Sequence, residues 1–281
     1  MIKLVITDLD DTLYSWIGFF IPSFYDMVQE LSLLLDVPQE KLLEEYKLFH
    51  QKVGSVEYPY ATLQLPSVKK IYMGHTDEDI KMQITPVFDK FNAKRDELLK
   101  LYPGVEETLK FLNDSNIIVV GYTESAVENG FYRLKKLGID HYFKEVYVSD
   151  SLYRLPDTIP SSPKTHIVHG KKPNAKILKD ICDSEGIDIE ETIYIGDSLS
   201  KDMLMAKQAG ITTIWCDFPK ENFSDLYGKL VAVSHWREQD FQQEQQYKHE
   251  WKINNYRPDY TIHTFEECKR IICNRNKQPS I

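Results

Sequence analysis

The stretch IKLVITDLDDT, residues 2–12, begins with a run of apolar and β-branched residues, interrupted only by Lys3, and then turns abruptly acidic. A continuous apolar run suits a strand buried on both faces, as in a parallel sheet covered by helices on either side. Comparable runs recur later in the chain, at residues 117–122, 145–149, 192–197 and 212–216, with a weaker one at 259–263. The first strand therefore predicts a parallel sheet that the later runs extend.

Helical patterns lie between most of these runs. Residues 124–137, 174–185 and 199–209 have the length and composition of helices, and Gly138 and Gly210 supply natural C-terminal stops. Strands and helices that alternate in this way pack by right-handed crossovers. We expect an α/β fold, a doubly wound parallel sheet with helices on both faces.

Two segments depart from this alternation. Residues 15–100 carry apolar positions at helical spacing, which predicts a small all-helical domain inserted after the first strand. The expected α/β domain therefore comprises residues 1–14 and 101–281, with the Pro103–Gly104 turn marking the return to it. Residues 218–257 are polar and aromatic, and we expect an exposed excursion with a helix near residues 231–251.

Composition excludes several classes of protein. The 281 residues carry a formal net charge of -9, which argues against nonspecific nucleic-acid binding, since that depends on clustered Lys and Arg. There is no signal-peptide pattern and no run of 18 apolar residues, so we expect a soluble, cytoplasmic protein that does not bind membranes. The four cysteines form no CxxC pair and are interpreted as reduced and structural. The sequence leaves the oligomeric state open.

The most informative polar residues are Asp8 and Asp10, at the carboxyl end of the first strand. Ligands bind at this edge of open α/β sheets. Two carboxylates separated by one residue can serve different roles, one turned toward an electrophile and the other toward a leaving group, and they attract a hard cation such as Mg²⁺. The alternative is an acidic turn that merely caps the strand.

A second acidic motif, GDSLSKD at residues 196–202, also follows a buried strand and leads into a helix. Asp197 is placed to complete a metal site. Asp202 is placed to orient a metal-bound water or a neighbouring lysine. The competing interpretation is that Asp197 and Ser198 only cap the helix.

Two further residues suit phosphate binding. Thr123 places a hydroxyl at a strand end beside the amides that open the next helix, where phosphate oxygens bind readily, although a plain N-cap explains it as well. Lys172, before Pro173, starts another helix, where an ammonium can neutralise a phosphate and a nucleophile. A solvent-exposed lysine is the ordinary alternative.

Taken together, these residues resemble the four motifs of the haloacid dehalogenase superfamily. The matching positions are Asp8, Asp10 and Thr12 for DxDxT, Thr123 for the second motif, Lys172 for the third, and Gly196, Asp197 and Asp202 for GDxxxxD. The resemblance covers residues 1–14 and 101–273, with a Rossmann-like core, and the helical insertion resembles the family's type-one cap. The family's lysine usually precedes a proline, which favours Lys172 over the adjacent Lys171.

The resemblance implies a magnesium-dependent phosphatase that acts on a small phosphorylated metabolite. In that mechanism Asp8 is the nucleophile and becomes an aspartyl-phosphate, and Asp10 is the general acid and base. Mg²⁺ is held by the Asp8 carboxylate, the Asp10 carbonyl and Asp197, with Asp202 supporting the site from outside the metal's ligands. Thr12, Thr123 and Lys172 bind the phosphate.

Other activities remain to be distinguished. Dehalogenases of the superfamily lack the second aspartate, so Asp10 favours phosphoryl transfer. A phosphomutase uses the same residues and excludes water more strictly, and a non-catalytic phosphometabolite-binding protein keeps the same fold. A nucleotide-binding dehydrogenase wants GxGxxG after the first strand, where this chain has Asp-Leu-Asp-Asp-Thr.

Overall fold

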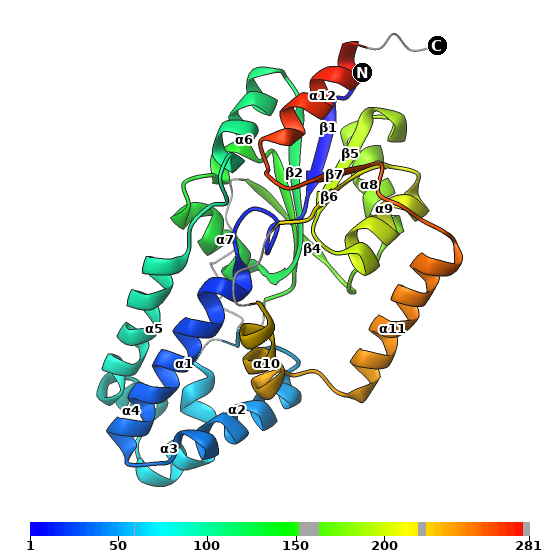
Figure 1. Cartoon of the computed structure of the whole chain (residues 1–281). Helices are drawn as coiled ribbons and strands as arrows, with labels where there is room; N and C mark the ends of the chain where they lie inside the picture. The colour runs from blue at the N-terminus through cyan, green and yellow to red at the C-terminus, as the bar shows by residue number, and fades with distance from the viewer. Residues whose placement is uncertain (59, 152–162, 219–222, 278–281) are drawn as a thin grey trace. The chain divides into compact units, whose positions relative to one another are not determined.

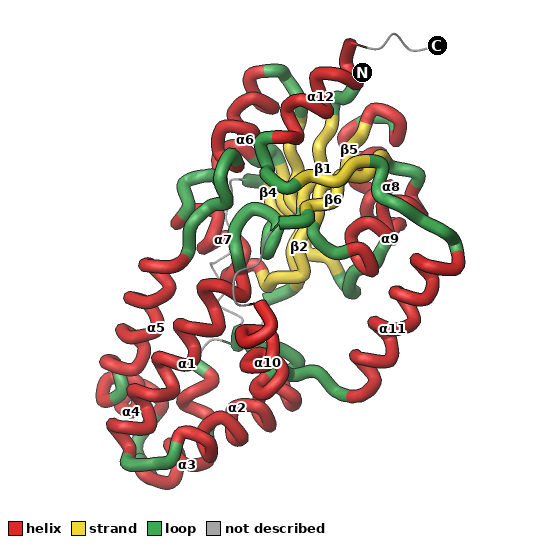
Figure 2. Tube along the Cα trace, in the orientation of Figure 1, coloured by secondary structure: helices red, strands yellow, loops and turns green. Residues whose placement is uncertain are grey.

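The computed structural model describes residues 1–58, 60–151, 163–218 and 223–277. Contacts between residues divide the chain into two compact units. The first comprises residues 1–15, 100–219 and 242–281, and the second comprises residues 16–99 and 220–241. The first contains the sheet, and the described part of the second is built from helices and loops (Figure 2).

The first unit is organised around one parallel sheet. Its strands within the described residues are β1 (Leu4–Thr7), β2 (Ile118–Ala126), β3 (Glu145–Ser149), β4 (Lys164–Val168), β5 (Thr192–Gly196), β6 (Thr212–Cys216) and β7 (Tyr260–Ile262). They lie in the order β4-β3-β2-β1-β5-β6-β7, and every neighbouring pair is parallel. The α/β fold with a doubly wound parallel sheet is thereby confirmed.

This strand order places a switch point at β1. The chain builds outward from β1 through β2 and β3 to β4, and then returns to the other side of β1 to start β5. Thr7, the last residue of β1, pairs with Gly121 of β2 and Ile195 of β5. Because ligands of open α/β sheets bind where the strand order reverses, Asp8 leaves the sheet at the expected position for a site.

Helices cover both faces of the sheet. The helical elements of this unit are α6 (Val105–Asp114), α7 (Val127–Lys136), η2 (Asp140–Tyr142), α8 (Ala175–Glu185), η3 (Ile189–Glu191), a π-helical turn (Leu199–Met203), α9 (Leu204–Ala209), most of α11 (Glu238–Ile253) and α12 (Glu267–Lys277). Figure 1 shows α6 and α7 on one face and α8 and α9 on the other. Leu4 and Ile6, which alternate along β1, pack into the core with Leu178 of α8 and Met205 of α9.

One strand of the sheet was not predicted. β4 lies at the edge and begins Lys-Thr-His, and only Val168 at its end is fully buried. An edge strand has a single hydrogen-bonded neighbour and needs no continuous apolar run. The apolar pattern that marks the buried strands is therefore missing at β4.

The described part of the second unit consists of helices joined by loops. Its elements are α1 (Trp16–Leu35), α2 (Gln39–Val53), η1 (Ala61–Gln64), α3 (Pro66–Ile71), α4 (Asp77–Gln83), α5 (Thr85–Leu98) and α10 (Phe223–Val233). Aromatic rings fill its interior: Phe24 of α1 meets Tyr46 of α2 edge to face at 4.9 Å between centroids. No helix among the described residues is long and apolar enough to cross a membrane.

Residues 218–257 were expected to form an exposed excursion, and this expectation is only partly correct. The segment forms two helices instead of one, and α10 packs against α1 and α2 with Leu230 and Val233 buried. The Tyr25 hydroxyl donates to the Lys229 carbonyl over 3.1 Å. α11, by contrast, has no buried residue, in keeping with its polar sequence. Whether the two units act as a catalytic core and a cap remains a prediction.

A buried histidine ties α10 to α2. His50 is 0% exposed, and its Nδ1 lies 2.8 Å from the Val233 carbonyl oxygen. Since a carbonyl oxygen can only accept a hydrogen bond, Nδ1 carries the ring hydrogen and Nε2 is unprotonated. No hydrogen-bond donor to Nε2 is found among the described residues. Burial lowers the pKa of His50 from its usual 6.5 to about 4, with nearby His235 adding to the effect.

The stability of the protein should therefore decline in acid. Between pH 6.5 and about 4, His50 is protonated in the unfolded chain but neutral in the folded chain. The free energy of unfolding therefore decreases as pH falls through this range. The full shift corresponds to about 3 kcal/mol. We expect His50→Asn, which keeps a donor near the Nδ1 position, to lose less stability between pH 7 and pH 4 than wild type in urea unfolding. His75→Asn, at an exposed position of the same unit, should behave like wild type; equal pH dependence in all three proteins would contradict the assignment.

Candidate active site

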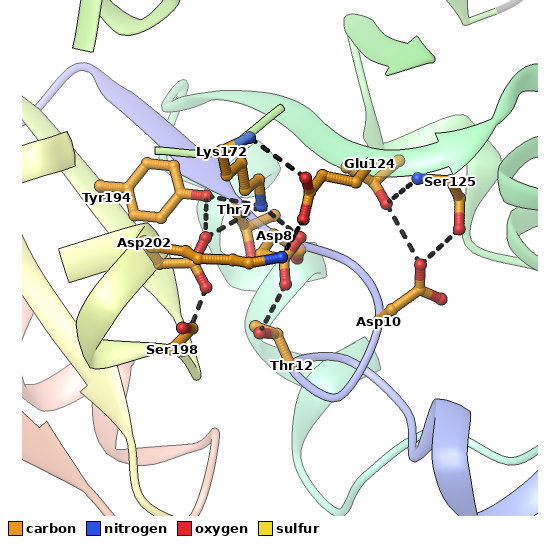
Figure 3. Close-up of polar contacts among 12 residues, drawn as sticks. Thr7, Asp8, Asp10, Thr12, Glu124, Ser125, Lys172, Tyr194, Ser198 and Asp202 are labelled. Atoms are coloured by element: carbon orange, nitrogen blue, oxygen red, sulfur yellow. Dashed lines mark hydrogen bonds and ion pairs between the residues drawn. The ribbon is translucent and has the colours of Figure 1, made fainter. Parts of the chain in front are cut away.

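Asp8 lies at the carboxyl end of β1 and is only 7% exposed. Its backbone amide continues the sheet by donating to the Ile195 carbonyl over 2.9 Å. On the side chain, Oδ1 lies 2.6 Å from the Lys172 ammonium and Oδ2 lies 3.4 Å from the Thr12 hydroxyl (Figure 3). The strand, the lysine and the turn after β1 together fix the orientation of this carboxylate.

Lys172 joins two acidic segments. Its Nζ donates to Asp8 Oδ1 and also to Asp202 Oδ1 at 2.9 Å, and it lies 3.1 Å from the Tyr194 hydroxyl. That hydroxyl in turn donates to Asp202 Oδ1 over 2.8 Å. Lys172 is 4% exposed whereas Lys171 is exposed, so the structure brings Lys172, the lysine preferred from the sequence, to Asp8.

The charges of this group depend strongly on one another. Burial raises the pKa of Asp8 well above its usual value; Lys172 opposes this, and Asp202 and Asp197 reinforce it. For Lys172, burial disfavours the ammonium, but the carboxylates of Asp202 and Asp8 outweigh burial and raise its pKa above the usual value. Lys172 is therefore charged at neutral pH and is stabilised by the carboxyl groups of Asp202 and Asp8.

The second acidic motif is shaped by the π-helical turn after β5. The Ser198 amide donates to Asp202 Oδ2 over 3.1 Å, which holds the Asp202 side chain against the end of the strand. A Cβ on Gly196 would lie 2.6 Å from Asp202 Cγ, so the glycine of the motif is required for this close approach. The Trp215 indole of β6 donates to the Asp197 carbonyl over 2.8 Å and anchors the turn from the other side.

These carboxylates form a candidate metal site. Asp8, Asp197 and Asp202 each offer an oxygen, and the three oxygens lie within 4.8 Å of one another. Oxygen donors of this kind suit Mg²⁺. Lys172 pairs with Asp8 and Asp202, and a divalent cation among the three carboxyl groups would offset their negative charge. The donor set thus fits the expected metal, and Asp202, predicted to support the site from outside the metal's ligands, lies within this group of oxygens.

Asp10 belongs to a separate group of side chains. Its Oδ2 accepts from the Ser125 hydroxyl at 2.6 Å and from the Thr123 hydroxyl at 3.2 Å. Its Oδ1 accepts from Arg133 Nη1 of α7 at 2.8 Å. In Figure 3 the Asp10 carboxylate lies toward Ser125 and away from Lys172. Thr123, predicted to bind phosphate, is in this structure a donor to Asp10, and its phosphate role stays a prediction.

Sequence reasoning missed several side chains of the site. Glu124 accepts from the Lys172 amide at 3.2 Å and from Lys201 Nζ at 2.6 Å, so it links the second and fourth motifs. Glu124 and Ser125 directly follow Thr123, and that adjacency was the available signal. Arg133 sits inside a helix, and nothing in its sequence spacing distinguishes it from a surface arginine.

The parallel sheet with its switch point, and the paired carboxylates at the exit of β1, define the class of α/β proteins that bind a ligand at the carboxyl edge. Residues 2–210 match the haloacid dehalogenase-like hydrolase family, and the chain belongs to that family. The resemblance drawn from the four motifs is confirmed.

Individual relatives and structures agree with this assignment. The chain is similar to a glyceraldehyde 3-phosphate phosphatase of Methanopyrus kandleri, with 28% identity over 76% of this chain and 83% of the relative. A phosphoglycolate phosphatase of Agrobacterium fabrum is 24% identical over 54% of this chain and 59% of its own. A crystal structure of 2-haloacid dehalogenase from Pseudomonas syringae pv. Tomato DC3000 has a TM-score of 0.57 at 19% identity, covering 98% of this chain and all of that one, which shows the shared fold.

Removal of the Lys172 ammonium should destabilise the fold. In Lys172→Met the buried carboxylates of Asp8 and Asp202 lose their shared cation, and breaking a buried ion pair from one side costs about 3–5 kcal/mol. Urea unfolding of the metal-free protein measures the loss. The control is Lys171→Met, which removes a lysine from an exposed neighbouring position and should change stability by less than about 0.5 kcal/mol. Similar losses in both variants would contradict the assignment.

Gly196→Ala tests the close approach at the acidic motif. Its Cβ cannot fit beside Asp202, so we expect a loss of about 1–3 kcal/mol and weaker binding of Mg²⁺ in calorimetry. Gly228→Ala of α10 is the matched control, because a Cβ there meets nothing within 4 Å. If Gly196→Ala bound Mg²⁺ and unfolded as the Gly228 variant does, the contact would be unimportant.

Proposed function

We propose that this protein is a magnesium-dependent phosphatase that hydrolyses small phosphate monoesters through an aspartyl-phosphate on Asp8. The observation that carries the proposal is the buried Asp8 carboxylate at the switch point, held by Lys172 and accompanied by Asp197 and Asp202. A nucleophile at this position meets substrate at the edge where α/β proteins bind ligands. Membership of a hydrolase family supports the reaction type.

In the first step an Asp8 oxygen attacks phosphorus, and the bond from phosphorus to the ester oxygen breaks. Asp10 gives a proton to the departing alcohol. In the second step water attacks the aspartyl-phosphate, Asp10 takes a proton from that water, and inorganic phosphate leaves Asp8. The two aspartates thus perform different chemistry from different surroundings, Asp8 beside a lysine and Asp10 among hydroxyls and an arginine.

Charge neutralisation supports the same mechanism. Mg²⁺ held by Asp8, Asp197 and the Asp10 carbonyl, with Asp202 nearby, would offset repulsion between the nucleophile and a phosphate dianion. The Lys172 ammonium, next to the attacking carboxylate, adds positive charge where the transferring phosphoryl oxygens lie. Thr12 and Thr123 are proposed to donate to the same phosphate.

The substrate class is proposed from two sources. Relatives named glyceraldehyde 3-phosphate phosphatase and phosphoglycolate phosphatase point to small phosphate esters. The second unit is proposed as a type-one cap that selects the substrate, since its larger stretch, residues 16–99, is inserted between β1 and β2. A small phosphorylated metabolite is therefore the expected partner.

Phosphate release tests the proposal directly. Wild type, Asp8→Asn and the surface variant Asp180→Asn are assayed with p-nitrophenyl phosphate, glyceraldehyde 3-phosphate and 2-phosphoglycolate, with Mg²⁺ or with EDTA. We expect turnover by wild type and Asp180→Asn only with Mg²⁺, and a loss of about three orders of magnitude or more in Asp8→Asn. Asp180 is a suitable control because its carboxylate pairs with Lys176 at the surface.

Mass spectrometry of the acid-quenched enzyme provides a second readout. One covalent phosphoryl group is expected on wild type during turnover and none on Asp8→Asn. Activity that survives in Asp8→Asn would rule out the covalent mechanism. Transfer of the phosphoryl group to a second hydroxyl of the substrate, with no phosphate release, would indicate a phosphomutase instead.

A further inference from the structure

The Asp10 carboxylate is held on both oxygens by side chains of β2 and α7. Arg133 Nη1 donates to Oδ1 over 2.8 Å, and the hydroxyls of Ser125 and Thr123 donate to Oδ2 over 2.6 and 3.2 Å. A carboxylate that accepts on both oxygens from fixed donors has little rotational freedom. Its direction is therefore set by these neighbours.

Arg133 and Ser125 are also coupled to each other. The same Nη1 donates to Ser125 Oγ over 2.9 Å, while the Ser125 hydroxyl points its hydrogen to Asp10. A serine has one hydrogen to donate and two lone pairs to accept, so the arginine determines which way this hydroxyl turns. Arg133 thus acts on Asp10 twice, directly on Oδ1 and through Ser125 on Oδ2.

Exposure separates the roles of the two charged groups. The Arg133 side chain is 4% exposed, whereas that of Asp10 is 22% exposed. The arginine is therefore too buried to contact a substrate, whereas part of the Asp10 side chain remains accessible. Burial of a guanidinium is energetically unfavourable unless it is paired with an anion, and Arg133 is paired with the proposed catalytic group Asp10.

Tyr14, in the segment that follows β1, lies next to the same group of side chains. Its side chain is fully buried, and burial, reinforced by the nearby Asp10 carboxylate and opposed by Arg133, raises the pKa of its hydroxyl well above the usual value. The Tyr14 backbone forms bridges with Asp10 and with Leu101. The segment that carries Asp10 is thus anchored in both backbone and side chain.

We propose that Arg133 is a positioning residue for Asp10, which it aims, directly and through Ser125, at the leaving oxygen of a phosphate ester. This inference rests on the proposed phosphatase function. When the phosphorus–oxygen bond breaks, the proton passes from the Asp10 carboxyl to the ester oxygen. The carboxylate that forms is the one with which Arg133 pairs.

Leaving groups of different basicity distinguish this role from a structural one. An alkoxide needs the proton from Asp10, whereas p-nitrophenolate is stable enough to leave without it. Because kcat/KM reports the steps up to the first irreversible bond cleavage, it isolates this proton transfer from hydrolysis of the aspartyl-phosphate. If Asp10 is no longer correctly oriented, kcat/KM should therefore fall more for alkyl esters than for aryl esters.

The experiment compares wild type with Arg133→Met, Arg133→Lys, Asp10→Asn and the Asp10→Asn/Arg133→Met double variant. The substrates are p-nitrophenyl phosphate and whichever of glyceraldehyde 3-phosphate and 2-phosphoglycolate wild type hydrolyses faster. We expect Arg133→Met to lower kcat/KM about 100-fold for the alkyl ester and less than about tenfold for the aryl ester. Arg133→Lys should recover part of the loss, and Arg133→Met should add less than about threefold in the Asp10→Asn background.

Arg270→Met is the matched control, because Arg270 forms an exposed ion pair with Glu267 on α12. It should leave both substrates unaffected. If Arg133→Met does not fold, Ser125→Ala removes only the indirect contact from Arg133 to Asp10. This variant should also lose more kcat/KM for the alkyl ester than for the aryl ester, but by a smaller factor. Equal losses for alkyl and aryl esters, or an undiminished loss in the Asp10→Asn background, would overturn the inference and leave the phosphatase function standing. A wild type that hydrolyses no ester would instead overturn the proposed function and this inference with it.

Discussion

The buried ion pair between Lys172 and the carboxylates of Asp8 and Asp202 is the constraint around which the site is built. The three residues come from the segments that follow β4, β1 and β5, which are far apart in the chain. A parallel sheet brings them together because its strands all end at one edge. Charged groups with so little exposure are stable only when they are paired. The strand ends, the turn at Gly196 and the Tyr194 hydroxyl must therefore all be correctly placed for these pairs to form.

The two aspartates of the first motif have different surroundings despite being separated by a single residue. Asp8 continues the line of β1 and faces the lysine, and Asp10 has left the strand and faces Arg133 and Ser125. Paired acids that perform different steps need environments that treat them differently. Here the difference arises because the chain turns immediately after the strand.

The helical unit gains a component that is distant in sequence. Between β6 and β7 the chain supplies α10, whose Leu230 and Val233 are buried and whose carbonyls accept from Tyr25 and His50. Two separate stretches of chain therefore build this unit. If it selects the substrate as proposed, both stretches contribute to that selection.

The sequence by itself determined the parallel sheet and the order of the motifs, because buried strands require continuous apolar runs and the acidic and basic residues follow directly at their ends. Asp8, Asp197 and Asp202 could be named for that reason, whereas Lys172 was named because it starts a helix and precedes a proline, as the family's lysine usually does. Only the tertiary structure placed Arg133 against Asp10, α10 in the helical unit and β4 at the sheet edge. Contacts between distant segments and the half-exposed pattern of an edge strand leave no local periodicity, so they appear only once the chain has folded.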